Sequence, residues 1–383
     1  MKEAVLVMAR RTPVGKVGGQ LSTLEPEKLL APLIRLLVTE VQLPPEWIDD
    51  VIIGNVVGPG GNIARKSVLE AGLPVTVPGV TIDRQCGSGL EAIIMAARFI
   101  QSGAGEIFLA GGVESVSRAP WKMFRPHTVT GTPTLYTRAP FTPIAFGDPD
   151  MGIAAEHVAG KYDISREDQD RYAFESHQKA VQAKRTGRFA PELAPLQVNG
   201  FRITDDECPR PDTSLEKLRS LPPVFSDRGT VTAGNACPIN DGAALVLMMS
   251  REKCELLNLT PVLRFVDSQA AGVDPRYPGI GPVPAVQKLL SRQRLNIDDL
   301  DIVEFNEAFA SQVLASLREL HLPLDKVNPG GGALALGHPY GASGAILMTR
   351  LYSEMLQHPY QRGLATLGIG GGMGLAVLVE AAL

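Results

Sequence analysis

GSGLEAIIMAARFIQSG (residues 87–103) and GASGAILMTRLYSEM (residues 341–355) decide the fold, because the same glycine-rich helix start recurs in both halves of the chain. Matching apolar strands flank the two segments: VIIGNVV (51–57) and IFLAGG (107–112) in the first half, DIVEFN (301–306) and LATLGIGGG (364–372) in the second. Strands that alternate with helices form βαβ units, which favour parallel sheets covered by helices. The repeat therefore predicts an α/β core built from two related halves.

The repeat is interrupted between about residue 116 and residue 221. A Pro- and Thr-rich stretch, WKMFRPHTVTGTPTLYTRAPFTP (121–143), precedes the charged helical sequence SREDQDRYAFESHQKAVQAKR (165–185). This change of pattern indicates an insertion on the first half. The predicted domains are an N-terminal half (1–115 plus 222–255), a loop domain (116–221) and a C-terminal half (256–383).

Composition sets limits on the class of protein. The chain has 383 residues, 44% of them hydrophobic, which is enough to bury a large core. A net charge of −4 with interspersed signs and only 5% aromatic residues argues against a nucleic-acid groove or a membrane-surface helix. Four cysteines without framework spacing argue against disulfides and a metal cluster and favour a reducing compartment, so we expect a cytoplasmic protein without a metal site.

Cys86 is the candidate nucleophile. It precedes a helix whose apolar positions follow helical spacing: Leu90, Ile93, Ile94 and Ala97. Free backbone N–H groups and the helix dipole stabilise a thiolate at such a position, and the glycines at 87 and 89 leave room for a substrate carbonyl. A buried, inert cysteine is the alternative interpretation.

Two further motifs supply polar side chains for such a site. In NEAF (306–309) we expect a helix to begin near Asn306, with Glu307 in its first turn, and a simple N-cap explains the pair equally well. His338 lies in the glycine-rich run NPGGGALALGHPYGASGA (328–345), where it could take a proton from Cys86 and return it to a leaving thiolate. A histidine that only satisfies a turn is the alternative.

Glycines also close the last strand. In LATLGIGGGMGLAVLVE (364–380), N–H groups near Gly370 could bind a developing oxyanion, although a glycine-rich hairpin explains the motif too.

As an ordered set these motifs resemble those of the thiolase family: CGSG (86–89), VTAGN (231–235), NEAF (306–309), GHP (337–339) and GGGMG (370–374). The resemblance covers essentially the whole chain, from ARRTPVGKVGG (9–19) to the last strand. It implies a five-layered αβαβα core of two pseudo-duplicated halves, with an inserted loop domain that holds coenzyme A. It also implies a homodimer or homotetramer.

The resemblance assigns roles residue by residue. Cys86 would accept the acyl group, His338 would activate it, and Asn306 would hold a water that stabilises the thioester oxygen. The N–H groups of Cys86 and Gly370 would form a second oxyanion hole. Coenzyme A and acyl-CoA would be substrates, and no permanently bound cofactor is expected.

This sequence departs from the family at the second catalytic cysteine. Thiolases usually carry C, apolar, GGG before the last strand, and here the cysteine position is Gly368. The subgroup that places a cysteine within the NEAF-like motif does not help, since that residue is Ala308. Cys237, where the family usually has a serine, is a hypothetical replacement for the lost base, although a small buried cysteine is a commonplace substitute for serine. Nothing around Cys208 and Cys254 suggests chemistry.

The resemblance also suggests where coenzyme A lies. Arg210 matches a position near the adenosine 3′-phosphate, Cys237 one in the pantetheine tunnel, and Met151 one in a loop-domain motif. Asp150 replaces the histidine that short-chain biosynthetic thiolases often carry before Met151, which leaves acetoacetyl specificity open. Basic residues of the insertion could attract phosphates or merely form a solvated face: Arg118, Lys122, Arg125 and Arg138.

The sequence thus predicts an acyl-CoA C-acyltransferase working through acyl-Cys86. Two alternatives stay open at this point. One is an acyl-CoA transferase or hydrolase without carbon–carbon bond chemistry, and the other is a weakly active acyl-CoA-binding protein or scaffold.

Overall fold

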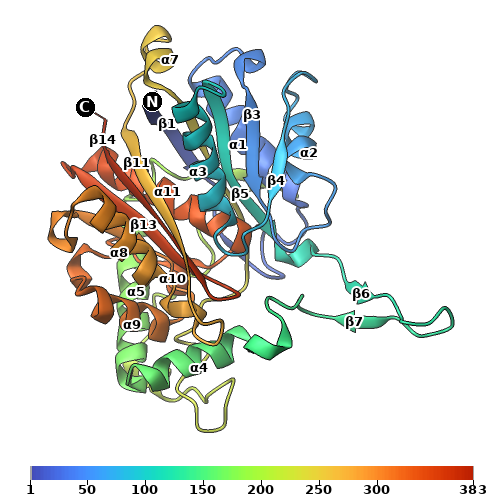
Figure 1. The fold of residues 1–383 in the computed structure, drawn as a ribbon, viewed down its shortest axis with the longest axis vertical. Coiled ribbons are helices and arrows are strands. Elements are labelled where there is room, and N and C mark those ends of the chain that lie inside the picture. Colours follow the sequence, from blue (N-terminus) through green and yellow to red (C-terminus); the bar gives the residue numbers. More distant parts are fainter. Residues whose placement is uncertain (1, 383) are drawn as a thin grey trace.

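A continuous array of ten hydrogen-bonded strands forms the centre of the molecule, and we describe it as two sheets that have the same strand pattern (Figure 1). They are seen in a computed structural model that describes residues 2–382. The first sheet has the order β1-β10-β5-β3-β4, with β2 paired to β10, and the second has the order β11-β14-β13-β12. They join through β1 and β11, where only Val5 and Leu6 pair with Arg264 and Leu263.

The strand bounds are β1 Ala4–Arg11, β2 Gly15–Lys16, β3 Asp50–Gly54, β4 Val80–Ile82, β5 Ile107–Ser115, β10 Asn240–Ser250, β11 Leu263–Gly272, β12 Ile302–Phe305, β13 Arg362–Ile369 and β14 Met373–Ala381. The helices that cover these sheets are α1 Pro26–Glu40, α2 Ile63–Glu70, α3 Ser88–Ser102, α7 Arg251–Leu256, α8 Pro282–Gln293, α9 Ala310–Leu320, α10 Ala333–Leu336 and α11 Tyr340–Gln357.

Parallel pairing accounts for a minority of the strand pairs, which corrects the expectation of parallel sheets. β3 pairs in parallel with β4 and β5, and β12 pairs in parallel with β13. These pairs are the products of the helical crossovers. The remaining pairs are antiparallel, from β5 through β10 to β1 and from β13 through β14 to β11. The strand order β3-β5-β10-β1 of the first sheet therefore matches the order β12-β13-β14-β11 of the second sheet, and the strand directions match as well.

Buried apolar side chains divide the molecule into five layers. One core fills the space between the two sheets and contains α3 and α11, with Ile93 and Met348 facing Val246 and Val377. A second core packs α1 and α2 on the outer face of the first sheet. A third packs α8 and α9 on the outer face of the second sheet. The layers α, β, α, β, α are the predicted fold class.

The segment between β5 and β10 lies outside these layers. A thin hairpin of β6 (Lys122–Phe124) and β7 (Thr134–Tyr136) extends away from the body, and α4 (Met151–Lys161) and α5 (Arg166–Arg185) lie beside α9 and α10 (Figure 1). Its other elements are β8 Leu196–Val198, β9 Phe201–Ile203 and α6 Leu215–Arg219. Among residues 2–382, no helix has the length and apolar character needed to cross a membrane.

A buried cluster of ions ties this segment to both halves. Arg11 on β1 binds Glu192 at 2.7 Å and Asp206 at 2.7 Å, and Arg350 on α11 binds Glu192 at 3.0 Å. The remaining members are Glu304 on β12, Glu354 on α11 and Arg188. Four carboxyl groups thus face three guanidinium groups. Glu304 has no hydrogen bond to the described residues, and burial raises its pKa to about 8 despite the nearby Arg350.

Candidate active site

Cys86 and His338 occupy equivalent places in the two halves. Each lies two residues before a central helix, Cys86 before α3 and His338 before α11. The first turns of these helices touch backbone to backbone: a Cβ at residue 89 would lie 2.7 Å from the carbonyl oxygen of Gly341. Glycine at 89 is therefore required by the close approach, which brings the segment of the thiol next to the segment of the imidazole.

The Ser343 hydroxyl orients the ring of His338. It lies 2.9 Å from the Pro339 carbonyl oxygen and 2.6 Å from His338 Nδ1. With the hydroxyl proton directed to Pro339, Nδ1 carries the ring proton and Nε2 keeps its lone pair. The side chain is buried, and burial lowers the pKa of His338 to about 4. The ring is neutral near pH 7 and able to accept a proton.

The Cys86 thiol is protonated at rest, which corrects the expectation of a stabilised thiolate. Burial raises its pKa to about 11. The backbone N–H groups of Gly370 and of Cys86 itself face the sulfur and lower the pKa, but desolvation outweighs them. The sulfur must therefore lose its proton during attack rather than before it. The same two N–H groups are placed to bind an oxygen beside the sulfur.

The segment Asn306–Phe309 is a loop, so the prediction that a helix begins near Asn306 is wrong. β12 ends at Phe305, and α9 begins only at Ala310 with Phe309 as its N-cap. The Glu307 carboxylate holds the loop because it accepts hydrogen bonds from four groups, namely Tyr172 Oη, Ser176 Oγ, Asn328 Nδ2 and the N–H of Leu334. Glu307 is therefore an anchor for the loop that carries Asn306, rather than a first-turn acid.

Three segments converge around Asn306. Its N–H donates to Thr366 on β13, while its side chain is buried with an Nδ2 that has no hydrogen-bond partner among residues 2–382. Next to it, the Cys237 N–H donates to the carbonyl of Ala308, and Ile239 pairs with His338. The loop that follows β12 thus meets β13 and the segment before β10, and that segment pairs with the one before α11.

Two family models cover nearly the whole chain. The model of the thiolase N-terminal domain matches residues 4–252, and the model of the thiolase C-terminal domain matches residues 259–381. The chain belongs to the thiolase family. It is accordingly an acyltransferase of the thiolase type.

Similar proteins agree along the full length. The chain is 51% identical over 382 residues to a putative acetyl-CoA C-acetyltransferase VraB of Staphylococcus epidermidis, with 99% of each chain covered. Among solved structures, an acetyl-CoA acetyltransferase of Bacillus anthracis matches with a TM-score of 0.95 and 38% identity, covering 100% of this chain and 99% of its own. A human mitochondrial 3-ketoacyl-CoA thiolase in complex with CoA matches with a TM-score of 0.94 and 37% identity over 100% and 98%.

In this thiolase Gln312 occupies the space that a side chain at position 368 would fill. A Cβ on residue 368 would lie 2.8 Å from Gln312 Nε2 and 3.1 Å from the carbonyl oxygen of Pro278. Gln312 is buried on α9, and its Nε2 has no hydrogen-bond partner among residues 2–382. Sequence reasoning missed this residue. A glutamine among the apolar positions of α9 was the signal that could have revealed it.

Cys237 lies close enough to Cys86 for the two thiols to interact electrostatically. Burial, followed by the charge of Cys86, raises the pKa of the Cys237 thiol well above its usual range. This position agrees with a tunnel residue beside the nucleophile. Whether Cys237 replaces the missing base stays a hypothesis.

Phe141 covers the glycine loop. A Cβ at residue 370 would lie 2.8 Å from Phe141 Cε2, so the aromatic ring lies directly on Gly370. Arg138 stacks on Phe141 at 4.5 Å and pairs with Asp148 at 3.0 Å. No motif in the sequence pointed to Phe141, because its contact depends on how the loop before α4 folds back over β13.

The residues predicted to bind coenzyme A lie in the segment between β5 and β10. Arg210 is exposed, and its N–H donates to His177 Nδ1 at 3.2 Å; burial, together with the Arg210 charge, lowers the pKa of His177 to about 4. Met151 is the first residue of α4 and is half-buried. The Asp150 side chain is 79% exposed and pairs with Arg138 at 3.4 Å.

The four basic residues of the insertion divide into two pairs. Arg118 pairs with Glu25 at 3.0 Å, and Arg138 pairs with Asp148 as described. Within residues 2–382, no ion pair forms at Lys122 or Arg125 on or beside the exposed hairpin strand β6. Of these four residues, Lys122 and Arg125 are therefore the two whose charges are free for a phosphate-bearing ligand, in addition to the exposed Arg210. Cys254 is buried, and Cys208 accepts a hydrogen bond from Asn240.

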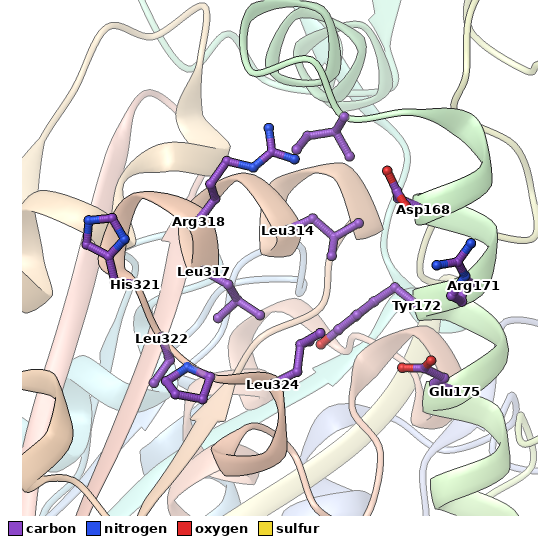
Figure 2. Close-up of a pocket in the computed structure, with 12 residues that line it drawn as sticks. Asp168, Arg171, Tyr172, Glu175, Leu314, Leu317, Arg318, His321, Leu322 and Leu324 are labelled. Atoms are coloured by element: carbon purple, nitrogen blue, oxygen red, sulfur yellow. The ribbon is translucent and has the colours of Figure 1, made fainter.

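One hollow in the surface lies away from Cys86. A surface hollow of about 540 Å³ lies between α5 and α9, where Asp168, Arg171 and Glu175 face Arg318 and His321 across an apolar floor (Figure 2). None of the predicted site residues lines it. The candidate site is defined instead by the segments that hydrogen bonds and close contacts bring together around Asn306 and Cys86.

Proposed function

We propose that this thiolase transfers acyl groups between CoA thioesters through an acyl-Cys86 intermediate. The observation that carries the proposal is the arrangement of a neutral, Nδ1-protonated His338 beside the segment of a thiol that faces the N–H groups of Gly370 and Cys86. Sulfur is both a good nucleophile and a good leaving group, so one thioester can be exchanged for another with little change in free energy.

In the first half-reaction His338 Nε2 takes the proton from Cys86 while the sulfur attacks the carbonyl carbon of acyl-CoA. The carbonyl π electrons move onto oxygen, and the Asn306 Nδ2 group stabilises the negative charge, directly or through a water. Collapse breaks the bond to the CoA sulfur, which takes the proton from His338. The acyl oxygen on Cys86 then lies at the N–H groups of Cys86 and Gly370.

Coenzyme A would bind along the segment between β5 and β10. Arg210 would lie near the 3′-phosphate, and Met151 and Cys237 would line the pantetheine path. Arg210 is exposed, Met151 is half-buried, and Cys237 lies beside Cys86, which is the order that a ligand entering from the surface requires. A solved thiolase of similar fold is described as a complex with CoA.

We further propose a homodimer or homotetramer in the cytoplasm. The hairpin arm carries exposed apolar side chains that a partner could cover: Trp121, Met123, Phe124, Val129 and Leu135. Four free cysteines fit a reducing compartment.

Acyl transfer or hydrolysis without carbon–carbon bond chemistry is the second candidate function. Gly368 favours it, because thiolysis must protonate an enolate leaving group and the side chain that usually does so is absent. A weakly active acyl-CoA-binding protein would retain the CoA path without acylation of Cys86.

Intact-protein mass after incubation with acetyl-CoA separates these functions. We expect one acetyl group per chain, lost again when free coenzyme A is added. Cys86→Ala should abolish the label, whereas Cys254→Ala should retain it. Acetoacetyl-CoA with coenzyme A then tests thiolysis. An unlabelled wild-type protein would contradict the proposal and leave only binding.

A further inference from the structure

Position 368 shapes the chemistry that this site can perform. A thiol there could remove or return a proton at a substrate carbon, but the volume beside Gly368 is filled by the carboxamide of Gln312. An amide N–H donates a hydrogen bond and cannot accept a proton from carbon at neutral pH. The substitution thus replaces a possible base by a hydrogen-bond donor.

The nearby carboxyl groups do not supply the base. Glu307 is held by its four donors behind the Asn306 loop. Glu114, whose charge reaches Cys86, accepts hydrogen bonds from Asn55 Nδ2 and from the N–H groups of Val56, Val57 and Gly341. Both carboxyl groups have their oxygens committed to the protein, so neither is free to approach a substrate.

Two buried donors, in contrast, are unused. Asn306 Nδ2 and Gln312 Nε2 have no hydrogen-bond partner among residues 2–382, and both side chains are at least nine-tenths buried. An unpaired buried N–H costs free energy, so such groups are retained where a ligand oxygen completes them. Asn306 belongs to the loop after β12, and Gln312 lies against Gly368 near the end of β13. Either donor suits the oxygen of an enolate.

We propose that the carbon nucleophile at this site arises by loss of CO₂ from a malonyl-type thioester, a CoA thioester whose α-carbon carries a carboxylate. This inference rests on the proposed acyl-Cys86 intermediate. It names the class of substrate that a condensing site can use when it has no base to remove a proton from carbon.

The step balances without an added base. The bond between the α-carbon and the carboxylate breaks, its electron pair forms the enolate, and CO₂ leaves. The enolate carbon bonds to the acyl carbonyl carbon, and collapse breaks the acyl–sulfur bond and returns the electron pair to Cys86. The resulting thiolate takes one proton from solvent through His338. Overall, acyl-CoA, malonyl-CoA and one proton give 3-ketoacyl-CoA, CO₂ and free coenzyme A.

The charge around the site favours this bond cleavage. Besides burial, the Glu114 charge raises the pKa of the Cys86 thiol, and the Glu307 charge raises that of the Cys237 thiol. A substrate carboxylate beside Cys86 would face the same repulsion and would also lose hydration in a buried region. Conversion to neutral CO₂ removes that desolvation cost.

The test supplies acetyl-CoA together with malonyl-CoA labelled with ¹³C in its free carboxyl group. We expect acetyl-Cys86 by mass, and release of labelled CO₂ in step with acetoacetyl-CoA. The product should form at least about 100-fold faster than from acetyl-CoA alone, since the missing base is typically worth 10²- to 10⁴-fold. Cys86→Ala should give no acetoacetyl-CoA.

The other outcomes separate the two proposals. Formation of acetyl-Cys86 without CO₂ release or product would overturn the decarboxylative step and leave the acyltransferase intact. Equal condensation of acetyl-CoA alone would also overturn it, by revealing a working base, and loss of that activity in Cys237→Ser would assign the base to that thiol. Absence of acetyl-Cys86 would overturn the proposed function and this inference together.

Discussion

Gly368→Cys should convert the site into one that handles carbon-bound protons. The new thiol would stand next to Gln312 on the face of β13 that carries the glycine loop. A positioned general acid–base contributes about 10²- to 10⁴-fold, which corresponds to about 2.7 to 5.4 kcal/mol of activation free energy. We therefore expect thiolysis of acetoacetyl-CoA to rise by that factor, while acetylation of Cys86 keeps its rate.

The substitution has a small steric cost. The new Cβ would lie 2.8 Å from Gln312 Nε2 and 3.1 Å from the carbonyl oxygen of Pro278, whereas ordinary contacts begin at 3.4 Å, so the amide must move by about 0.6 Å and the backbone by less. Because Gln312 Nε2 ends a flexible side chain, we expect a loss of about 1 kcal/mol in unfolding free energy, at the low end for added volume in a core.

The assay follows the loss of acetoacetyl-CoA in the presence of coenzyme A, with thermal unfolding measured in parallel. Gly368→Ser is the matched control, since it adds similar bulk without a thiol. A folded Gly368→Cys protein that forms acetyl-Cys86 but shows the wild-type rate of thiolysis would refute the reasoning, because the missing thiol would then not be the limiting group.

Three further predictions address the resting site and the core. The rate of Cys86 acetylation should be independent of pH between about 5 and 10 and should fall below about pH 4. The reason is that the step needs a neutral His338 and a thiol that His338 can deprotonate. A single rise near pH 8 in the rate of acetyl-CoA consumption would instead indicate a thiolate that forms before the substrate binds. Ser343→Ala should slow this step about 10-fold, because the His338 ring would no longer be held in one tautomer. Quenching the reaction at successive times and measuring the acetylated protein by mass would show the slower rate. An unchanged rate would mean that other contacts hold the ring. Glu304 binds its proton more tightly in the folded chain than in the unfolded chain, because burial raises its pKa to about 8. Its contribution to the free energy of unfolding therefore favours the fold at low pH. That contribution is lost as the pH rises from the ordinary pKa of a glutamate through about 8. Glu304→Gln should flatten that decline in denaturant unfolding curves, and a parallel decline in wild type and variant would contradict the assignment.

The sequence repeat predicted the fold because each copy is a local pattern of strand and helix signals, and the same pattern occurs in both halves of the chain. The glycine-rich starts of α3 and α11 carry their own helical signals, and glycine at 89 is needed for the contact between the two helices. That contact brings the segment of Cys86 next to the segment of His338. The domain bounds of the insertion stay a prediction.

The detailed site was less accessible from sequence because tertiary contacts override local preference. Asn306 and Glu307 have the composition of a helix start, but four hydrogen bonds from distant segments to Glu307 hold them in a loop. The expected thiolate at Cys86 failed for a related reason. The favourable interaction of a thiolate with a helix terminus is only a fraction of the free energy needed to bury that charge. How deeply a side chain is buried depends on the whole fold.

The pKa shifts of Cys86 and His338 also give a reason for the proposed nucleophile and its proposed base to come from different halves. A thiolate–imidazolium pair at rest would place two charges in the buried layer between the sheets, at a high desolvation cost. A neutral thiol beside a neutral imidazole avoids that cost until a thioester arrives, and the charge then forms on an oxygen that faces the N–H groups of Cys86 and Gly370. Each half of the fold thus supplies one neutral partner, and the glycine contact between α3 and α11 determines their separation. Widening that contact by Gly89→Ala should therefore slow acylation far more than it weakens CoA binding, and a proportional loss of both would show that the contact serves only to hold the halves together.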